Sequence, residues 1–256
     1  MRRIDNNHEF SYSLVNNYEG WLNSESDYNK YYGNSENPLP FEKFDESRRL
    51  NFYAQLFKLS VHPEYEQDDT YLVLGREFEN RICNIPTTVQ LTNKFSFVSN
   101  KGDTYKVILN SDVAQMIYNR AVRSVPKYQV EIKGILPNGL RFLGYADEVY
   151  ENCIVDIKTT SNFNKANYDN SLQVALYLHF IDNYLVQRGF YQVTEFYKSK
   201  AAGINEFIMK DTFVVESERI TDSQLQHFAD LCKEILNNVS SFEKDLTNYK
   251  HYFKTF

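Results

Sequence analysis

The chain has 256 residues, of which 42% are hydrophobic and 24% are charged, and its formal net charge is −6 at pH 7. This length fits one large domain, or a core with a helical addition. The negative charge excludes a globally basic surface, so any contact with nucleic acid requires a local basic patch. Aromatic residues make up 16% of the chain, and most of them are expected in the core.

The cysteines bear on both metal chemistry and location. Cys83, Cys153 and Cys232 lie far apart and form no C-x-x-C pair. This spacing excludes the usual zinc-ribbon and four-cysteine iron–sulfur patterns within the chain. An odd count without a secretory leader fits a reducing cytoplasm, and no apolar run approaches the length of a membrane span. We therefore expect a cytoplasmic location and no membrane partner.

Residues 1–66 are expected to form an N-terminal helical region. Ser11 or Ser13 can cap a short helix with an apolar face. Residues 33–40 contain the turn residues of a loop, and residues 41–60 have helical spacing that ends at His62-Pro63.

The expected core covers residues 67–220. A helix is predicted over residues 68–83, with Glu79 beside its apolar stripe. Gly75 lies inside this helix and would be explained by a close backbone approach. Short strands are predicted within residues 95–110, and a helix capped by Ser111 is predicted to Val125.

The pattern then changes to strands. Residues 127–158 predict a three-stranded meander with a hairpin turn at Pro137-Asn138-Gly139. One long helix is predicted over residues 163–188, ended by Gly189. Further elements are two strands, near 190–198 and 204–216, and a C-terminal helix within residues 221–256 that starts with the capping box Thr221-Asp-Ser-Gln224 and packs on the core.

The hairpin of the meander carries the most informative polar residues. Asp147 lies on its first strand, and Asp156 and Lys158 lie on its second. Because side chains alternate across a strand, Asp156 and Lys158 point to the same face. Two carboxylates and an ammonium group beside a sheet can hold a hard divalent cation and a water molecule.

Four motifs follow one another in the chain: Gly75-Arg-Glu-Phe-Glu79, Gly144-Tyr-Ala-Asp147, Asp156-Ile-Lys158 and Gln173-Val-Ala-Leu-Tyr177. Each is weak alone, but their order and element types together resemble the PD-(D/E)xK nuclease superfamily, in its RecB-like and phage-exonuclease-like branch. The motifs span about residues 75–177. The resemblance implies an α/β, restriction-endonuclease-like fold, in which helices flank a central mixed sheet, with an N-terminal helical region and a C-terminal helix.

The resemblance also implies a metal site. Asp147 and Asp156 would be the central ligands, and Glu79 would reach the metal from the neighbouring helix. The backbone carbonyl of Ile157 would be a further ligand. The implied cofactor is Mg²⁺ or Mn²⁺, and no iron–sulfur cluster is expected because the cysteines are too few. Glu77 remains an alternative to Glu79.

The remaining motif residues have roles in the implied chemistry. Lys158 would position or deprotonate water and stabilise negative charge. Gln173 and Tyr177 are separated by one helical turn and share a face, from which they would orient the metal ligands or touch the DNA backbone. Ordinary packing is the alternative for this pair.

The implied function is metal-dependent hydrolysis of DNA by an exonuclease of phage or bacterial recombination, repair or genome processing. Its partners would be DNA and a recombination or helicase protein. Lys165, Lys198 and Lys200 are candidates for phosphate contacts, with a solvated face as an equal alternative. Two further readings stay open: a catalytically silent nuclease-fold module that binds DNA or protein, and a nuclease for RNA or branched DNA.

Overall fold

The computed structural model describes the chain except for residues 1–3, 6, 34, 63–69, 84–93, 100, 113–114, 116–125, 184, 200–203 and 255–256. The chain divides into two compact units. The first contains residues 1–66, 133–144 and 221–256, and the second contains residues 67–132 and 145–220. The predicted α/β class is confirmed, because helices flank a mixed sheet of eight strands in the described residues.

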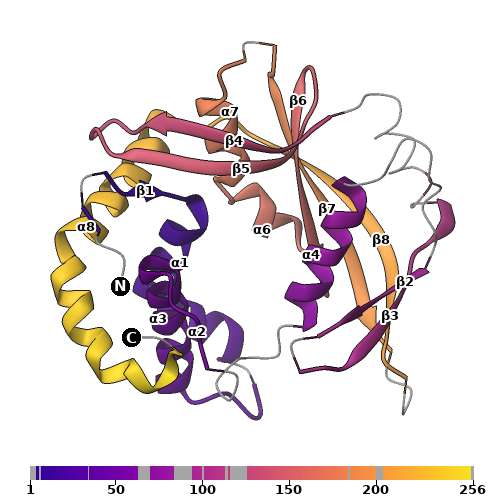
Figure 1. The fold of residues 1–256 in the computed structure, drawn as a ribbon, viewed down its shortest axis with the longest axis horizontal. Coiled ribbons are helices and arrows are strands. Elements are labelled where there is room, and N and C mark those ends of the chain that lie inside the picture. Colours follow the sequence, from indigo (N-terminus) through magenta and orange to yellow (C-terminus); the bar gives the residue numbers. More distant parts are fainter. Residues whose placement is uncertain are drawn as a thin grey trace. The chain divides into compact units, whose positions relative to one another are not determined.

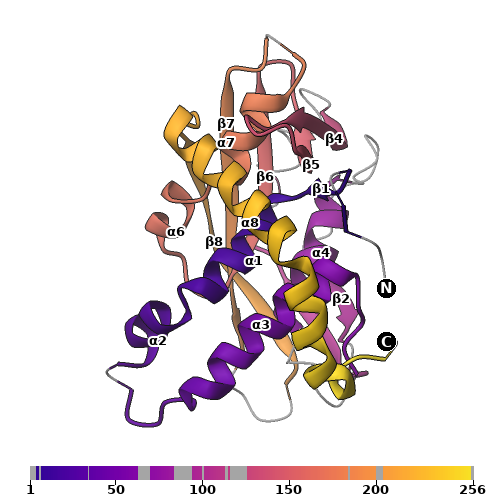
Figure 2. The same cartoon turned by 90° about the vertical axis from the view of Figure 1, so that its left-hand side faces the viewer.

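The first unit is mainly helical. Its helices are α1 (Tyr12–Leu22), α2 (Ser24–Tyr32), α3 (Phe41–Phe57), α8 (Asp222–Leu246) and the short 3-10 helix η1 (Thr247–Tyr252). Figure 2 shows α1, α3 and α8 lying together. Trp21 of α1 stacks on Phe52 of α3 and meets Phe242 of α8 edge-on, so an aromatic core joins the three helices.

Capping residues explain where two of these helices begin. The Ser11 hydroxyl accepts the backbone N–H of Leu14, which satisfies one free donor of α1. Thr221 and Gln224 form the predicted capping box at the start of α8. Two features of the unit differ from prediction: α2 was not expected, and α3 ends at Phe57 rather than at His62-Pro63, because Lys58 adopts a left-handed conformation with φ 55°.

Most of the sheet belongs to the second unit. The strands that lie wholly or partly in this unit are β2 (Lys94–Val98), β3 (Thr104–Ile108), β4 (Lys127–Ile135), β5 (Arg141–Val149), β6 (Cys153–Thr160), β7 (Arg188–Lys198) and β8 (Glu206–Ser217). Residues 133–135 of β4, residues 141–144 of β5 and the whole of β1 (Glu9–Phe10) belong to the first unit. The order is β1-β5-β6-β7-β8-β3-β2, and β4 pairs with β5. Strand β1 (Glu9–Phe10) pairs with β5 at Arg141 and Phe142, within the first unit. The predicted meander and the predicted strands of the 95–110 region are confirmed.

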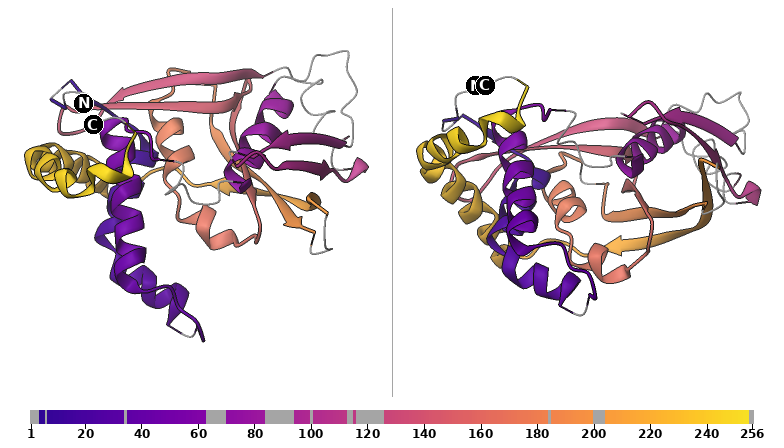
Figure 3. Two further views of the ribbon diagram at one scale, coloured as in Figure 1. Left: turned by 60° about the horizontal axis from the view of Figure 1, so that its bottom comes forward. Right: turned by 90° about the horizontal axis from the view of Figure 1, so that it is seen from below.

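Helices cover both faces of β6 in the second unit. Asp156 and Lys158 share a face with the residues of β7 that pack against Val174 of α7 (Gln173–Phe180). Ile157 points the other way and packs in one cluster with Phe78 of α4 (Thr70–Cys83). Figure 1 shows α4 and α7 beside the central strands, and α4 also lies beside β2 (Figure 3).

The prediction of one long helix over residues 163–188 is wrong. The chain forms α6 (Lys165–Asp169) and α7, and it enters β7 at Arg188. The break between the helices is held by a tertiary contact, because the Tyr191 hydroxyl donates to Ser171 at 2.8 Å and accepts the backbone N–H of Val174 at 3.1 Å. Gly189 does not end a helix. It lies in β7, where an added Cβ would collide with Val174 and Leu178.

The helix predicted between Ser111 and Val125 lies mostly outside the described residues. Among the helices that the structure describes, none has the length and apolar character needed to cross a membrane.

Candidate active site

Asp147 lies at the end of the backbone pairing between β5 and β6, where a side-chain hydrogen bond joins the two strands. The strands pair at Glu148 with Val155 and at Val149 with Ile154. One step further, Oδ2 of Asp147 accepts the backbone N–H of Ile157 at 2.7 Å. The carboxylate is therefore fixed on one side by the backbone of β6, and only 8% of the residue is exposed.

Asp156 is held by two side chains on its own face of the sheet. Lys158 Nζ lies 2.7 Å from Oδ2 of Asp156, as the two-residue spacing predicts. Gln173 Nε2 donates to Oδ1 of Asp156 at 3.1 Å and to the Tyr177 hydroxyl at 2.9 Å. The motif on α7 thus contacts the acid on β6, and orientation of the metal ligands stays one of its two predicted roles.

Glu79 reaches the same region from α4. Gly75, one turn earlier, allows α4 to approach β6 closely, because an added Cβ would lie 2.8 Å from Oγ1 of Thr159. Glu79 and Asp147 are bridged by Gln129 of β4, whose Nε2 donates to Oε1 of Glu79 at 2.7 Å and to Oδ1 of Asp147 at 3.1 Å. Glu77 instead faces Arg76 at 3.9 Å.

Burial and like charge raise the pKa values of all three acids. Burial, with the charge of Glu79, raises the pKa of Asp147 to about 6. Burial raises the pKa of Asp156 to about 6 although Lys158 opposes this shift. Burial also raises the pKa of Glu79. For Lys158, burial alone would lower the pKa, but the charge and hydrogen bond of Asp156 raise it. An additional positive charge would therefore relieve an electrostatic cost at this site.

The donor chemistry fits a hard divalent cation. Glu79, Asp147 and Asp156 offer carboxylate oxygens, the ligands that Mg²⁺ and Mn²⁺ prefer. Within the described part of the chain, no three His, Cys, Asp or Glu side chains are grouped closely enough to hold a metal ion as they stand. Glu79 and Asp147 share Gln129, and Asp156 is paired with Lys158, so a cation would have to use the remaining lone pairs of these carboxylates. The side chain of Ile157 is buried in the core, and its carbonyl remains a predicted ligand.

The predicted phosphate-binding lysines are not gathered at these acids by any described contact. Lys165 is paired with Asp169 at 2.5 Å, which offsets its charge. Lys198 donates to the hydroxyl of Tyr105 and lies over its ring. Lys200 lies outside the described residues.

Sequence reasoning missed Gln129. Its backbone adopts φ 48°, a left-handed conformation that costs a residue with a side chain on the order of 1–3 kcal/mol. Residue type gives no sign of this conformation, because glutamine is not a residue that favours positive φ. The only available signal was its position on a predicted strand before the Asp147 hairpin.

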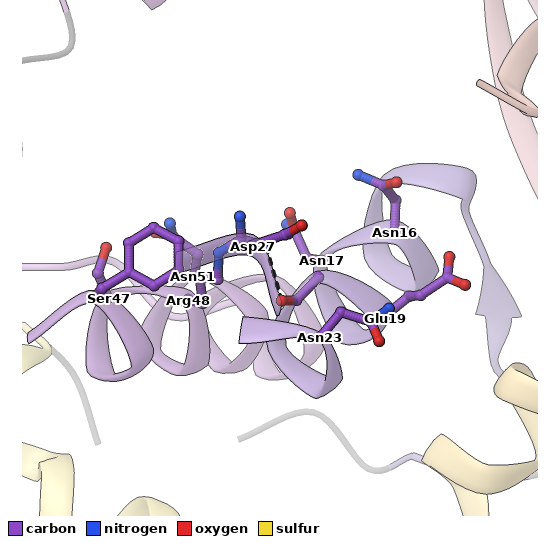
Figure 4. Close-up of a pocket in the computed structure, with 10 residues that line it drawn as sticks. Asn16, Asn17, Glu19, Asn23, Asp27, Ser47, Arg48 and Asn51 are labelled. Carbon is purple, nitrogen blue, oxygen red and sulfur yellow. Dashed lines mark hydrogen bonds and ion pairs between the residues drawn. The ribbon is translucent and has the colours of Figure 1, made fainter. Parts of the chain in front are cut away.

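A separate cavity of about 580 Å³ lies in the first unit, between α1, α2 and α3 (Figure 4). Amide side chains contribute much of its lining, and its charged groups are already engaged. Asp27 pairs with Arg48 at 2.9 Å, and Glu19 bonds His227 at 2.9 Å. None of the predicted site residues lines this cavity.

Neither a scan against protein-family models nor a search of the curated proteins finds a match to the chain.

Proposed function

We propose that this protein is a metal-dependent nuclease that hydrolyses phosphodiester bonds in DNA. The observation that carries the proposal is the set of contacts around two neighbouring strands. Asp147 is fixed by the backbone of β6, and Asp156 is held between Lys158 and Gln173. An acid that is oriented on both oxygens while burial opposes its ionisation is typical of a functional site rather than of a solvated surface.

The proposed roles follow from these contacts. Asp147, Asp156 and Glu79 would hold Mg²⁺ or Mn²⁺, with the carbonyl of Ile157 as a further oxygen. The metal ion, when bound, would polarise the phosphate and lower the pKa of a bound water. Lys158 would place its ammonium group beside Asp156 to orient water or to stabilise charge on the phosphate.

Gln173 and Tyr177 would act through Asp156. The amide of Gln173 spans from the Asp156 carboxylate to the Tyr177 hydroxyl, and it limits the rotation of the acid. Such outer contacts keep metal ligands in place and typically contribute about 10–100-fold to metal affinity or activity. The proposal extends to an exonuclease of phage or bacterial recombination, repair or genome processing, acting in the cytoplasm with a recombination or helicase protein.

The test is cleavage of end-labelled linear DNA by the purified protein in Mn²⁺, in Mg²⁺ and in EDTA. Asp147→Asn and Lys158→Ala should abolish the metal-dependent cleavage. A matched control is Asp211→Asn on β8, because Asp211 also accepts a backbone N–H at 2.7 Å but is exposed and makes no described contact with the site. Absence of cleavage, or equal cleavage by all variants, would contradict the proposal.

A second candidate function is that of a nuclease-fold module that binds DNA or protein and does not cleave DNA. Two observations favour it: the net charge is −6, and Lys165 is paired with an acid. Calorimetric titration of Mn²⁺ separates the two candidates. A nuclease should release or absorb heat on Mn²⁺ binding, and Asp147→Asn should abolish this heat. A module without a metal site should show no such heat. Binding of DNA in EDTA with no cleavage in Mn²⁺ would favour the module.

A further inference from the structure

Gln129 combines an unusual backbone with a bridging side chain. It lies on β4 with φ 48°, one of the two described non-glycine residues with positive φ. Its Nε2 donates to one oxygen of Glu79 and one oxygen of Asp147, at 2.7 and 3.1 Å. A strained backbone persists only where its surroundings hold it in place, so this outlier calls for a functional hypothesis.

We propose that Gln129 is a positioning residue that holds Glu79 beside Asp147, ready for a divalent cation. This inference rests on the proposed nuclease function. It assigns to a glutamine outside the four motifs the task of bringing an acid from α4 to an acid from β5.

The two acids repel each other when both are ionised. Glu79 and Asp147 hydrogen-bond each other directly when one of them holds a proton, but once both are ionised, as cation binding requires, a shared donor offsets their repulsion. The amide group of Gln129 supplies N–H donors to both. Oδ2 of Asp147 accepts the backbone N–H of Ile157, and Oδ1 accepts the N–H of Gln129. Because a carboxylate oxygen has two lone pairs, Oδ1 can keep the contact with Gln129 and still bind a cation.

The backbone conformation of Gln129 and the two hydrogen bonds of its side chain depend on each other. Positive φ changes the direction of the side chain relative to an ordinary strand residue. At Gln129 this direction leads to Glu79 and Asp147. Strand β4 nevertheless runs without interruption from Lys127 to Ile135. Two variants can therefore separate conformation from chemistry. Gln129→Gly accepts the positive φ without an amide, and Gln129→Asn tolerates it with an amide that is one methylene shorter.

The experiment is calorimetric titration of Mn²⁺ into the wild type and both variants, after a thermal melt in EDTA has shown that each is folded. We expect both variants to bind Mn²⁺ about 10-fold more weakly, the range typical of lost outer contacts. The matched control is Gln226→Ala, which removes a surface amide that donates to Asp230 at 2.9 Å. This control should bind Mn²⁺ as the wild type does.

Steady-state cleavage provides a second readout. Loss of positioning should lower kcat at subsaturating Mn²⁺ and leave KM for DNA unchanged, and high Mn²⁺ should restore the rate. Wild-type Mn²⁺ affinity in Gln129→Gly would overturn the inference, as would a raised KM with unchanged Mn²⁺ binding, which would indicate a DNA contact instead. These outcomes leave the nuclease proposal intact, provided that Asp147→Asn still abolishes cleavage. Absence of Mn²⁺ heat from the wild type would overturn both.

Discussion

Oδ2 of Asp147 accepts the backbone N–H of Ile157 at 2.7 Å, immediately beyond the paired residues of β5 and β6. The side chain thus continues the strand pairing beside Asp156 and Ile157, the two predicted metal ligands on β6. Asp147 makes a structural contact and has a proposed chemical role, so its substitution must preserve the contact in order to test the role. Asparagine does so, because its amide oxygen can still accept this N–H.

The raised pKa of Asp147 predicts a pH-dependent stability for the metal-free protein. Its pKa rises from 3.8 to about 6 on folding, so the native state binds more protons between these values. The free energy of unfolding should therefore fall as pH rises from about 4 to 6 and stay low above 6. Asp147→Asn should remove this loss and stabilise the metal-free protein at pH 7 by about 1–3 kcal/mol.

Urea unfolding in EDTA at pH 4 and pH 7 measures this effect. The variant and the wild type should converge at pH 4, and Asp211→Asn should follow the wild type throughout. A variant that is less stable than the wild type at pH 7 would show that the charge of Asp147 stabilises the fold instead.

Gln173 and Tyr177 should differ in their effects on activity. Gln173→Ala removes the donor to Asp156, and we expect a fall in the single-turnover cleavage rate of about 10–100-fold. Tyr177→Phe keeps the buried ring and removes only the hydroxyl that Gln173 contacts, so a smaller loss is expected. Single-turnover cleavage rates at saturating Mn²⁺ measure both. Equal and full activity in both variants would assign the pair to packing alone.

Gly75 should control the distance between α4 and β6. Gly75→Ala adds a methyl group 2.8 Å from Oγ1 of Thr159, which should push α4 away and displace Glu79. We expect weaker Mn²⁺ binding and lower activity. Thr159→Ala removes the colliding atom, so the double variant should recover Mn²⁺ affinity.

The same pair gives a test of stability. In the Thr159→Ala background, Gly75→Ala should add about 1 kcal/mol to the free energy of unfolding, because alanine is the better helix former. Failure of the double variant to recover would show that the approach of α4 is not what Gly75 provides.

The capping box of α8 gives a prediction that is separate from the site. Thr221→Ala removes the acceptor for the N–H of Gln224 and should lower the free energy of unfolding by about 1 kcal/mol. Thr221→Ser retains the hydroxyl and serves as the control. Chemical denaturation of the two variants measures the difference, and equal stability would contradict a role for the cap.

Local signals made much of this fold predictable. The serine at position 11, the capping box at Thr221 and the turn at Asn138-Gly139 act over a few residues, and the elements they delimit are confirmed. The spacing of Asp156 and Lys158 likewise places both on one face because a strand alternates. The ion pair between them follows from that alternation.

Tertiary contacts account for what the sequence did not reveal. The break before α7 depends on Tyr191, a residue of a later strand, and Gly189 serves packing rather than helix termination. The bridge made by Gln129 depends on a positive φ, which cannot be predicted from a glutamine in the sequence. The pairing of Lys165 with Asp169 is different, because their four-residue spacing on a helix was visible in the sequence.

The most direct test of the proposed metal site is a crystal structure with Mn²⁺ and a short DNA oligonucleotide, using anomalous scattering to locate the metal. We predict an anomalous peak that contacts carboxylate oxygens of Asp147 and Asp156, with Glu79 within reach and a DNA phosphate beside Lys158. A peak that avoids Asp147 and Asp156, or DNA bound with its phosphates away from these residues, would contradict the account.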